Sequence, residues 1–195
     1  MKLTKVDKAT FCHEFGHVLT ATLLYGVEIM ERMEVIGTTE RIDGHVYLKC
    51  YPDLTQEEFE MLKVGRNEEI TGLQQRYKDL MKKVEDIRIL FGGIVAENIC
   101  GYTKVKIHRG TDAEKIKSII PDKQQQMKIW REVYNLLEPH RNLLNALTDW
   151  GIEKVEWGDE VFFVCIHKTE LKEKMERYEQ TERGCNKQSA NFGGY

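Results

Sequence analysis

The chain has 195 residues, which is enough for one domain with a single hydrophobic core. Its 29 basic and 32 acidic residues leave a formal net charge of -3, which gives no electrostatic reason to expect nucleic-acid binding. No apolar run approaches the roughly 18 residues that cross a bilayer, and the N-terminus lacks the apolar stretch of a signal peptide. The five cysteines are odd in number and form no CxxC pair, so we expect a reduced, cytoplasmic protein.

The N-terminal half predicts a long helix, a small sheet and further helices. Residues 7–25 read as a helix that Gly26 ends as a C-terminal stop. Strands are predicted in the later part of 27–36 and over 44–50, and we expect them to form a small sheet or hairpin beside this helix. Residues 55–100 are predicted to be helical, with a break near residue 66.

The C-terminal half predicts more helices. One starts near residue 111, and residues 123–149 form one or two more, interrupted at Pro139 because proline cannot continue a helix. The stretch 159–180 leaves the structure open, since residues 161–167 have strand-like composition and the residues after them resemble a polar helix. The sequence as a whole therefore predicts a mainly α domain with a small β-sheet.

The expected domain covers residues 1–182. Residues 183–195 show no periodicity, so we expect a mobile C-terminal tail there.

Residues 13–17 read HEFGH, which matches the HExxH pattern of zinc peptidases. His13 and His17 are four residues apart, so both imidazoles project from one face of a helix and can share a metal. Glu14 lies near the same face and can accept a proton from a metal-activated water. Because we expect residues 7–25 to form an amphipathic helix, the motif predicts a zinc metallopeptidase with Glu14 as its general base.

Neighbouring residues predict how this helix packs. Phe15 falls on the opposite face and is expected in the core, whereas Gly16 leaves room for another element. Gly92 and Gly93 lie together inside a predicted helix, where each costs about 1 kcal/mol relative to alanine. We therefore expect close approach to a neighbouring backbone at this pair.

A zinc site needs a third protein ligand, and the residues alone offer two candidates. The metzincin class places a third histidine six residues after the second, where this chain has Leu23, so that class is excluded. Thermolysin-like enzymes use a glutamate from a downstream helix, and Glu97 fits that description. Asp112, at the start of the helix after a loop, is the other candidate.

Several segments of the chain resemble, in the same order, motifs of one known family. Residues 12–19 (CHEFGHVL) are similar to HEAGHAL, residues 90–98 (LFGGIVAEN) to LLGGRAAEE, and residues 110–115 (GTDAEK) to TGASNDLEKA, with weaker likenesses at 134–141 and 158–160. On these matches, which span roughly residues 9–160, the chain resembles the peptidase domain of the FtsH family of membrane-anchored, ATP-dependent zinc proteases.

The resemblance implies a mainly helical zinc-peptidase fold with Zn²⁺ as its cofactor. It also implies that Asp112 is the third ligand and that Glu97 lies nearby as a supporting group. The family's substrate-pairing strand, which binds substrate by β-addition, is matched by position at Gly44, His45, Val46 and Tyr47. We interpret His45 itself as an ordinary surface residue of this strand.

Neither a GxxxxGK[ST] phosphate loop nor a membrane segment occurs in the chain, in contrast to the family. We therefore expect an ATP-independent zinc endopeptidase that acts on peptides or unfolded protein segments. Two alternatives stay open: a peptidase subunit that works with a separate ATPase chain, and a catalytically silent binding or regulatory module of the same fold. The intact HExxH argues against the silent module, because binding alone has no need of Glu14.

Overall fold

The computed structural model describes residues 5–38, 41–49, 67–102 and 110–191, together with Thr55, Gln56, Glu58 and Glu60. This part of the chain is mainly helical and contains one small sheet, as the sequence predicted. Its helices are α1 (Lys5–Tyr25), α3 (Asn67–Val84), α4 (Ile87–Ile99), α5 (Gly110–Ile119), α6 (Lys123–Leu137), α7 (Arg141–Glu153) and α8 (Lys168–Asn191). Short 3-10 helices cover Val27–Ile29 (η1) and Glu138–His140 (η2), and the strands are β1 (Met30–Thr38), β2 (Ile42–Leu48) and β3 (Val161–His167).

The sheet is antiparallel with the strand order β2-β1-β3. In the central strand, Val35 lies opposite Gly44 of β2 and Val164 of β3. The hairpin of β1 and β2 was predicted, and the open stretch 159–180 proves to be strand β3 followed by helix α8. Because β2 pairs with a neighbour on one side only, it is an edge strand whose other edge carries no strand in the described part of the chain.

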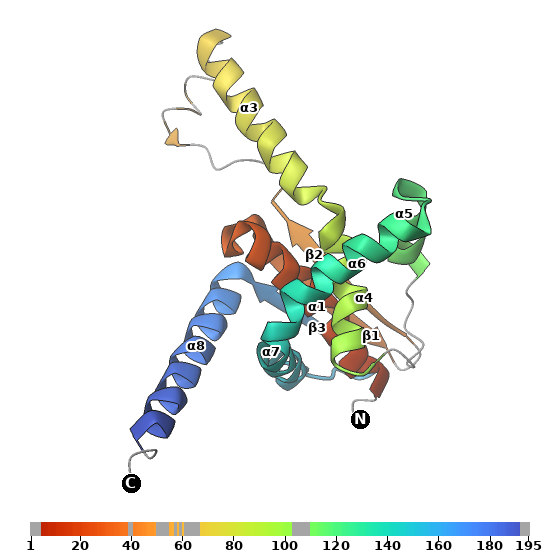
Figure 1. Cartoon of the computed structure of the whole chain (residues 1–195), viewed down its shortest axis with the longest axis vertical. Coiled ribbons are helices and arrows are strands. Elements are labelled where there is room, and N and C mark those ends of the chain that lie inside the picture. The colour runs from red at the N-terminus through yellow and green to blue at the C-terminus, as the bar shows by residue number, and fades with distance from the viewer. Residues whose placement is uncertain are drawn as a thin grey trace.

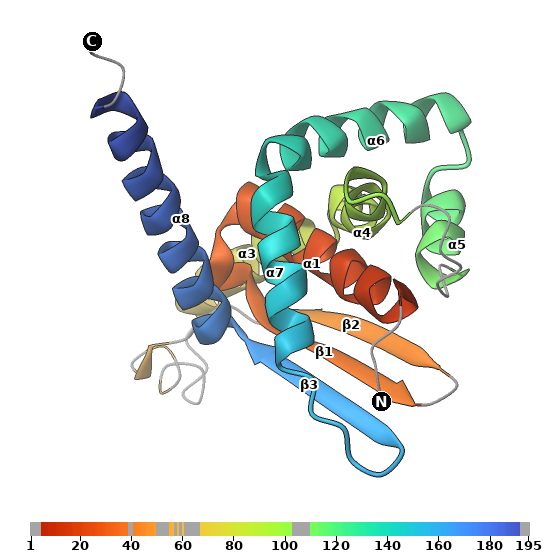
Figure 2. The same ribbon diagram turned by 90° about the horizontal axis from the view of Figure 1, so that it is seen from below.

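Helix α1 lies at the centre of the molecule. It crosses one face of the sheet, and α4 and α7 pack against its other sides (Figure 1, Figure 2). Every residue from 9 to 21 is buried, so the prediction of an amphipathic helix is wrong. A helix enclosed on all sides has no solvent face, and its polar side chains must point at other elements. Phe15 is fully buried in the core, as expected.

Glycines allow α1 and α4 to approach each other closely. A Cβ atom on Gly92 would lie 2.5 Å from the carbonyl oxygen of Gly16, and a Cβ atom on Gly16 would lie 2.5 Å from the Cβ atom of Ala96. Real Cβ atoms do not come this close to other heavy atoms, so any side chain at either glycine would push the helices apart. The close approach predicted for Gly92 is confirmed, and it places the following turns of α4 directly against α1.

The long helix predicted after the break near residue 66 is wrong at one point, because the structure breaks it again between α3 and α4. Asp86 has extended backbone angles there, and its carboxylate accepts a 2.9 Å hydrogen bond from the backbone N–H of Arg88. This is the geometry of a helix N-cap, which satisfies a backbone donor that the new helix leaves free. The predicted break near residue 66 lies outside the described residues. The interruption at Pro139 is confirmed, because η2 separates α6 from α7.

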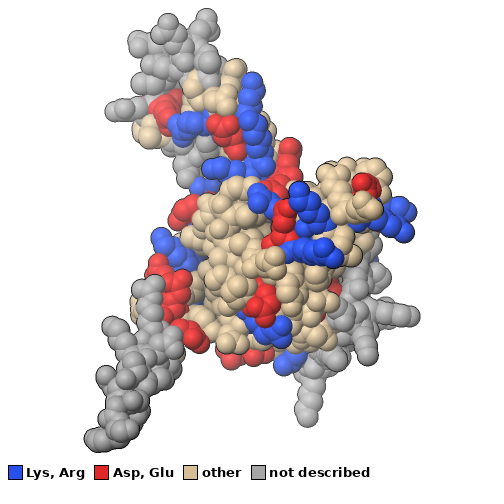
Figure 3. Space-filling model, in the orientation of Figure 1, with Lys and Arg blue, Asp and Glu red and all other residues tan. Residues whose placement is uncertain are grey.

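Helices α3 and α8 project from the body in different directions (Figure 1). Helix α8 continues to Asn191, beyond residue 182 where the sequence predicted a tail, and residues 192–195 lie outside the described part. Basic and acidic side chains are intermingled over the face that Figure 3 shows. Among the described helices, none combines the length and the apolar composition that a membrane span requires.

Candidate metal centre

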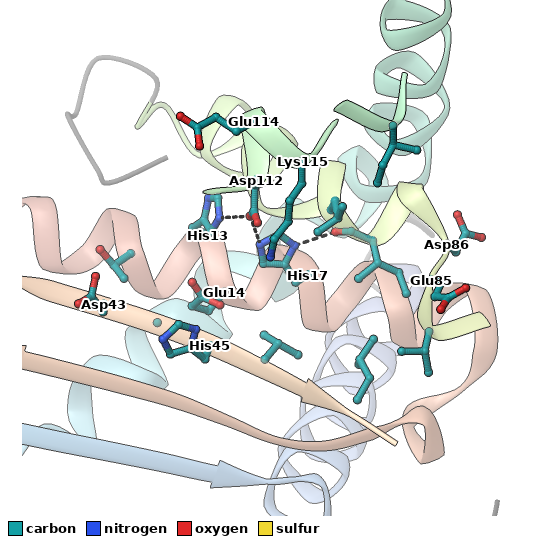
Figure 4. A pocket seen from close by; sticks show the side chains of 18 of the residues that line it. His13, Glu14, His17, Asp43, His45, Glu85, Asp86, Asp112, Glu114 and Lys115 are labelled. Carbon is teal, nitrogen blue, oxygen red and sulfur yellow. Dashed lines mark hydrogen bonds and ion pairs between the residues drawn. The ribbon is translucent and has the colours of Figure 1, made fainter. Parts of the chain in front are cut away.

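Three of the predicted site residues meet at one point. His13 and His17 come from α1, and Asp112 comes from the first turn of α5 (Figure 4). The Asp112 Oδ2 atom lies 3.0 Å from the Nε2 atom of each histidine. The three ligand atoms lie within 4.8 Å of one another, and no other cluster of three such side chains occurs in the described part of the chain. The group can therefore hold a metal ion.

Helix α4 fixes the orientation of both imidazoles. The Nδ1 atom of His13 donates a 2.6 Å hydrogen bond to Oε1 of Glu97, which is fully buried. The Nδ1 atom of His17 donates a 2.7 Å hydrogen bond to the carbonyl oxygen of Ile89. Both histidines therefore present Nε2 toward Asp112, which is the arrangement that metal-binding histidines adopt when another group holds their second nitrogen. Glu97 lies on the far side of His13 from Asp112, in the supporting place that the resemblance implied.

Strong electrostatic coupling ties the three side chains together. Burial alone would lower the pKa of His13, but its hydrogen bonds with Asp112 and Glu97 raise that pKa to about 10. Burial would raise the pKa of Asp112, but its contacts with His13 and His17 hold that pKa well below its ordinary value. These shifts favour a protonated His13 beside an ionised Asp112, and binding of a metal ion would release that proton.

Gly93 provides the space between the two imidazoles, a role that was not predicted from the sequence. A Cβ atom at this position would lie 2.6 Å from Nε2 of both His13 and His17. The glycine pair therefore has two functions, since Gly92 contacts the backbone of α1 while Gly93 faces the metal group. The four-residue spacing between Gly93 and Glu97 places both on one face of α4 and was the available signal.

Glu14 projects from α1 toward β2, where its side chain packs against Gly44 (Figure 4). A Cβ atom on Gly44 would lie 2.6 Å from Glu14 Oε1, so only glycine leaves room for this carboxylate. Glu14 is 6% exposed, and burial raises its pKa although the nearby His17 and His13 act in the opposite direction. A buried carboxylate with a raised pKa is chemically able to accept a proton near neutral pH, and Glu14 lies beside the candidate metal centre.

These side chains line a cavity of about 730 Å³ between α1, α4, α5 and β2. Consecutive residues from Arg41 to Val46 line it, which means that the cavity follows the edge of β2 and not one face of the strand. Of the predicted substrate strand, Gly44, His45 and Val46 line the cavity. Tyr47 is not among the lining residues, and its ring lies 4.0 Å from the guanidinium carbon of Arg32. His45 is exposed, as expected, but it also borders the cavity beside Glu14.

Comparisons of the chain with models of protein families, with curated proteins and with solved structures found no match. The resemblance to the FtsH family therefore stays a prediction that rests on the motifs.

Proposed function

We propose that this chain is a zinc-dependent endopeptidase that cleaves peptides or unfolded protein segments, with Glu14 as the general base. One observation carries the proposal: a buried His13–His17–Asp112 group and Glu14 share one cavity that follows the edge of β2 on which the described residues place no strand. A purely structural metal site would have no need of a base beside it or of an open strand edge.

The ligand group fits zinc in its donors and its dimensions. Two imidazole nitrogens and one carboxylate oxygen are a ligand set of catalytic zinc sites, which keep a fourth position open. Zinc bonds of about 2.0–2.1 Å in a tetrahedral arrangement separate the ligand atoms by roughly 3.3 Å. The 3.0 Å distances from Asp112 Oδ2 to the two Nε2 atoms come within a few tenths of an ångström of this spacing.

A zinc ion bound here would lower the pKa of a water molecule toward about 7 and polarise the scissile carbonyl. The chain's own residues supply the remaining chemistry. Glu14 holds the attacking water through its carboxylate oxygens, takes its proton, and passes that proton to the leaving amine. Glu97 and the carbonyl of Ile89 keep the two imidazoles in the tautomer that leaves Nε2 free to bind the metal.

The edge of β2 provides a place for an extended substrate. An unpaired strand edge offers backbone N–H and C=O groups, which an incoming peptide can pair with as an additional strand. A strand of the length of β2 spans roughly 20 Å at about 3.3 Å per residue, so it can pair with the interior of a chain. Only a peptide or an unfolded segment can adopt this conformation. We therefore propose endopeptidase activity on such substrates, without ATP.

Two variants test the proposal together with the wild-type protein. The wild type is expected to bind about one zinc per chain and to cleave an unstructured test protein such as casein. Glu14→Gln preserves the shape of the side chain but cannot accept a proton, so it should keep zinc and lose cleavage. His13→Ala should lose both. Equal zinc content in the wild type and His13→Ala would exclude the metal site, and full activity of Glu14→Gln would exclude the mechanism.

A further inference from the structure

Lys115 brings a positive charge to the cavity at the candidate metal centre. It lies one helical turn after Asp112 in α5, so both side chains lie on the same face of that helix. Lys115 lines the cavity together with the two histidines, and Figure 4 shows its side chain extending from α5 toward them. Within the described part of the chain, no ion pair joins its ammonium group to a carboxylate.

The charges around the cavity make this lysine distinctive. The acidic side chains that line it are Glu14, Asp43, Glu85, Asp86, Asp112 and Glu114. Lys115 and Arg41 are the described lysine and arginine residues among the lining, and Arg41 is held by Asp43 at 2.7 Å. Negative charge that develops on a substrate in this acidic cavity is therefore unfavourable unless a cation lies next to it. Besides a bound metal, Lys115 is the lysine or arginine of the described lining that no carboxylate holds and that can provide this charge.

We propose that Lys115 stabilises the oxyanion that forms on the scissile carbonyl, an inference that rests on the proposed peptidase function. Glu14 lies against Gly44 on the β2 side of the cavity, so the water attacks from that side. Water attacks a carbonyl carbon roughly at a right angle to the C=O bond, so the oxygen can face α5, which supplies Asp112, Glu114 and Lys115 to the lining. The flexible four-carbon stem of Lys115 allows its ammonium group to reach an oxygen there and donate a hydrogen bond.

The proposed hydrolysis proceeds by addition of water to the scissile carbonyl and then by loss of the amine. The water oxygen forms a bond with the carbonyl carbon, its proton moves to Glu14, and the π electrons of the carbonyl move onto the oxygen beside Lys115. The carbon–nitrogen bond then breaks, the carbonyl forms again, and the leaving nitrogen takes the proton from Glu14. Lys115 stays protonated throughout, so it changes the energy of the charged intermediate and transfers no proton.

The test compares ligands that differ in the charge on the reacting group. A phosphinic peptide carries a negative tetrahedral centre, whereas the matched amide peptide carries a neutral carbonyl. Dissociation constants for both are measured by calorimetry on zinc-loaded Glu14→Gln protein, with and without Lys115→Met. Because the interaction strengthens only as charge develops, we expect Lys115→Met to weaken phosphinic binding by roughly 100-fold. Amide binding should change by less than about 3-fold, and zinc content should stay the same.

Lys117→Met is the matched control. Lys117 is exposed on the same helix and does not line the cavity, so its removal changes the charge by the same amount elsewhere. This variant should leave both dissociation constants unchanged. In the Glu14-containing enzyme, Lys115→Met should lower kcat by about 10²–10³-fold with little change in KM, and Lys115→Arg should restore part of the loss.

The outcomes separate this proposal from the proposed function. An active wild type whose phosphinic affinity and kcat are unaffected by Lys115→Met would overturn the role of Lys115 alone. Equal weakening of phosphinic and amide binding would also overturn it, because a general substrate contact has no preference for the oxyanion. A wild type that neither cleaves nor binds the phosphinic peptide with zinc present would overturn the peptidase function, and the role of Lys115 with it.

Discussion

Gly93→Ala is expected to remove tight zinc binding while leaving a folded protein. The added methyl carbon would lie 2.6 Å from Nε2 of both His13 and His17. Zinc must approach the same two nitrogens to about 2.0–2.1 Å, so the methyl group and the metal compete for nearly the same space. Either the imidazoles rotate away from each other, or the metal is excluded. Both outcomes break the ligand geometry, and we expect the zinc affinity to fall by at least about 100-fold.

The stability of the metal-free protein should change much less. Overpacking a tight interior typically costs about 1–3 kcal/mol, but alanine is favoured over glycine inside a helix by about 1 kcal/mol. We therefore expect the free energy of unfolding in urea to fall by no more than about 2 kcal/mol. Zinc titration against a competing chelator measures the affinity, and urea unfolding of the zinc-free protein measures the stability.

The neighbouring glycine is the matched control. A methyl group on Gly92 would lie 2.5 Å from the backbone carbonyl oxygen of Gly16 and 2.5 Å from the Thr20 hydroxyl, away from the imidazoles. A backbone carbonyl cannot rotate away as a side chain can, so Gly92→Ala should destabilise the fold by about 2–3 kcal/mol. The molecules that remain folded should still bind zinc. Wild-type zinc affinity in Gly93→Ala would refute the assignment of this space to the metal.

The remaining predictions concern the ligands, the base and the energy source. Asp112→Asn should abolish tight zinc binding, whereas Glu97→Gln should lower the zinc affinity by about 10–100-fold. Competition with a chelator measures both affinities. A larger loss in Glu97→Gln than in Asp112→Asn would reverse the roles of the two carboxylates. Gly44→Ala should keep zinc but lower kcat by at least about 10-fold, because the added methyl group would lie 2.6 Å from Glu14 Oε1 and displace the base. Unchanged steady-state kinetics would contradict this role of Gly44. Cleavage by the purified chain should be equally fast with and without ATP, and faster for casein than for a tightly folded protein; stimulation by ATP would contradict the proposal.

Local patterns in the sequence predicted much of the site. The spacing of His13 and His17 is a helical property, so the shared face follows from four positions along the chain. Asp112 and Glu97 were both recognised as candidates, but the residues alone could not assign their roles. The distinction depends on how α4 and α5 pack around α1, which is information that no local pattern contains.

Two features of the helices were not predicted. The broken helix at Asp86 was missed although two local signals mark it: the pattern changes there from an amphipathic segment to an almost wholly apolar one, and aspartate is a residue type that caps helices. The enclosure of α1 was missed because α4 and α7, which pack against it, lie far from it along the chain. Burial of a helix on all sides requires every one of its neighbours to be placed first.

The position of the three candidate ligands in the fold has a consequence for how a bound metal would leave. His13 and His17 belong to the buried segment 9–21, whose amide hydrogens should exchange with solvent only on global unfolding. Asp112 belongs to α5, in which the residues from 113 to 119 are exposed apart from Ile116. Such a helix can open locally at a small fraction of the global unfolding free energy. The two histidines therefore stay in place while Asp112 can move away with α5. We expect the rate of metal exchange to follow the opening rate of α5, with the rest of the fold intact.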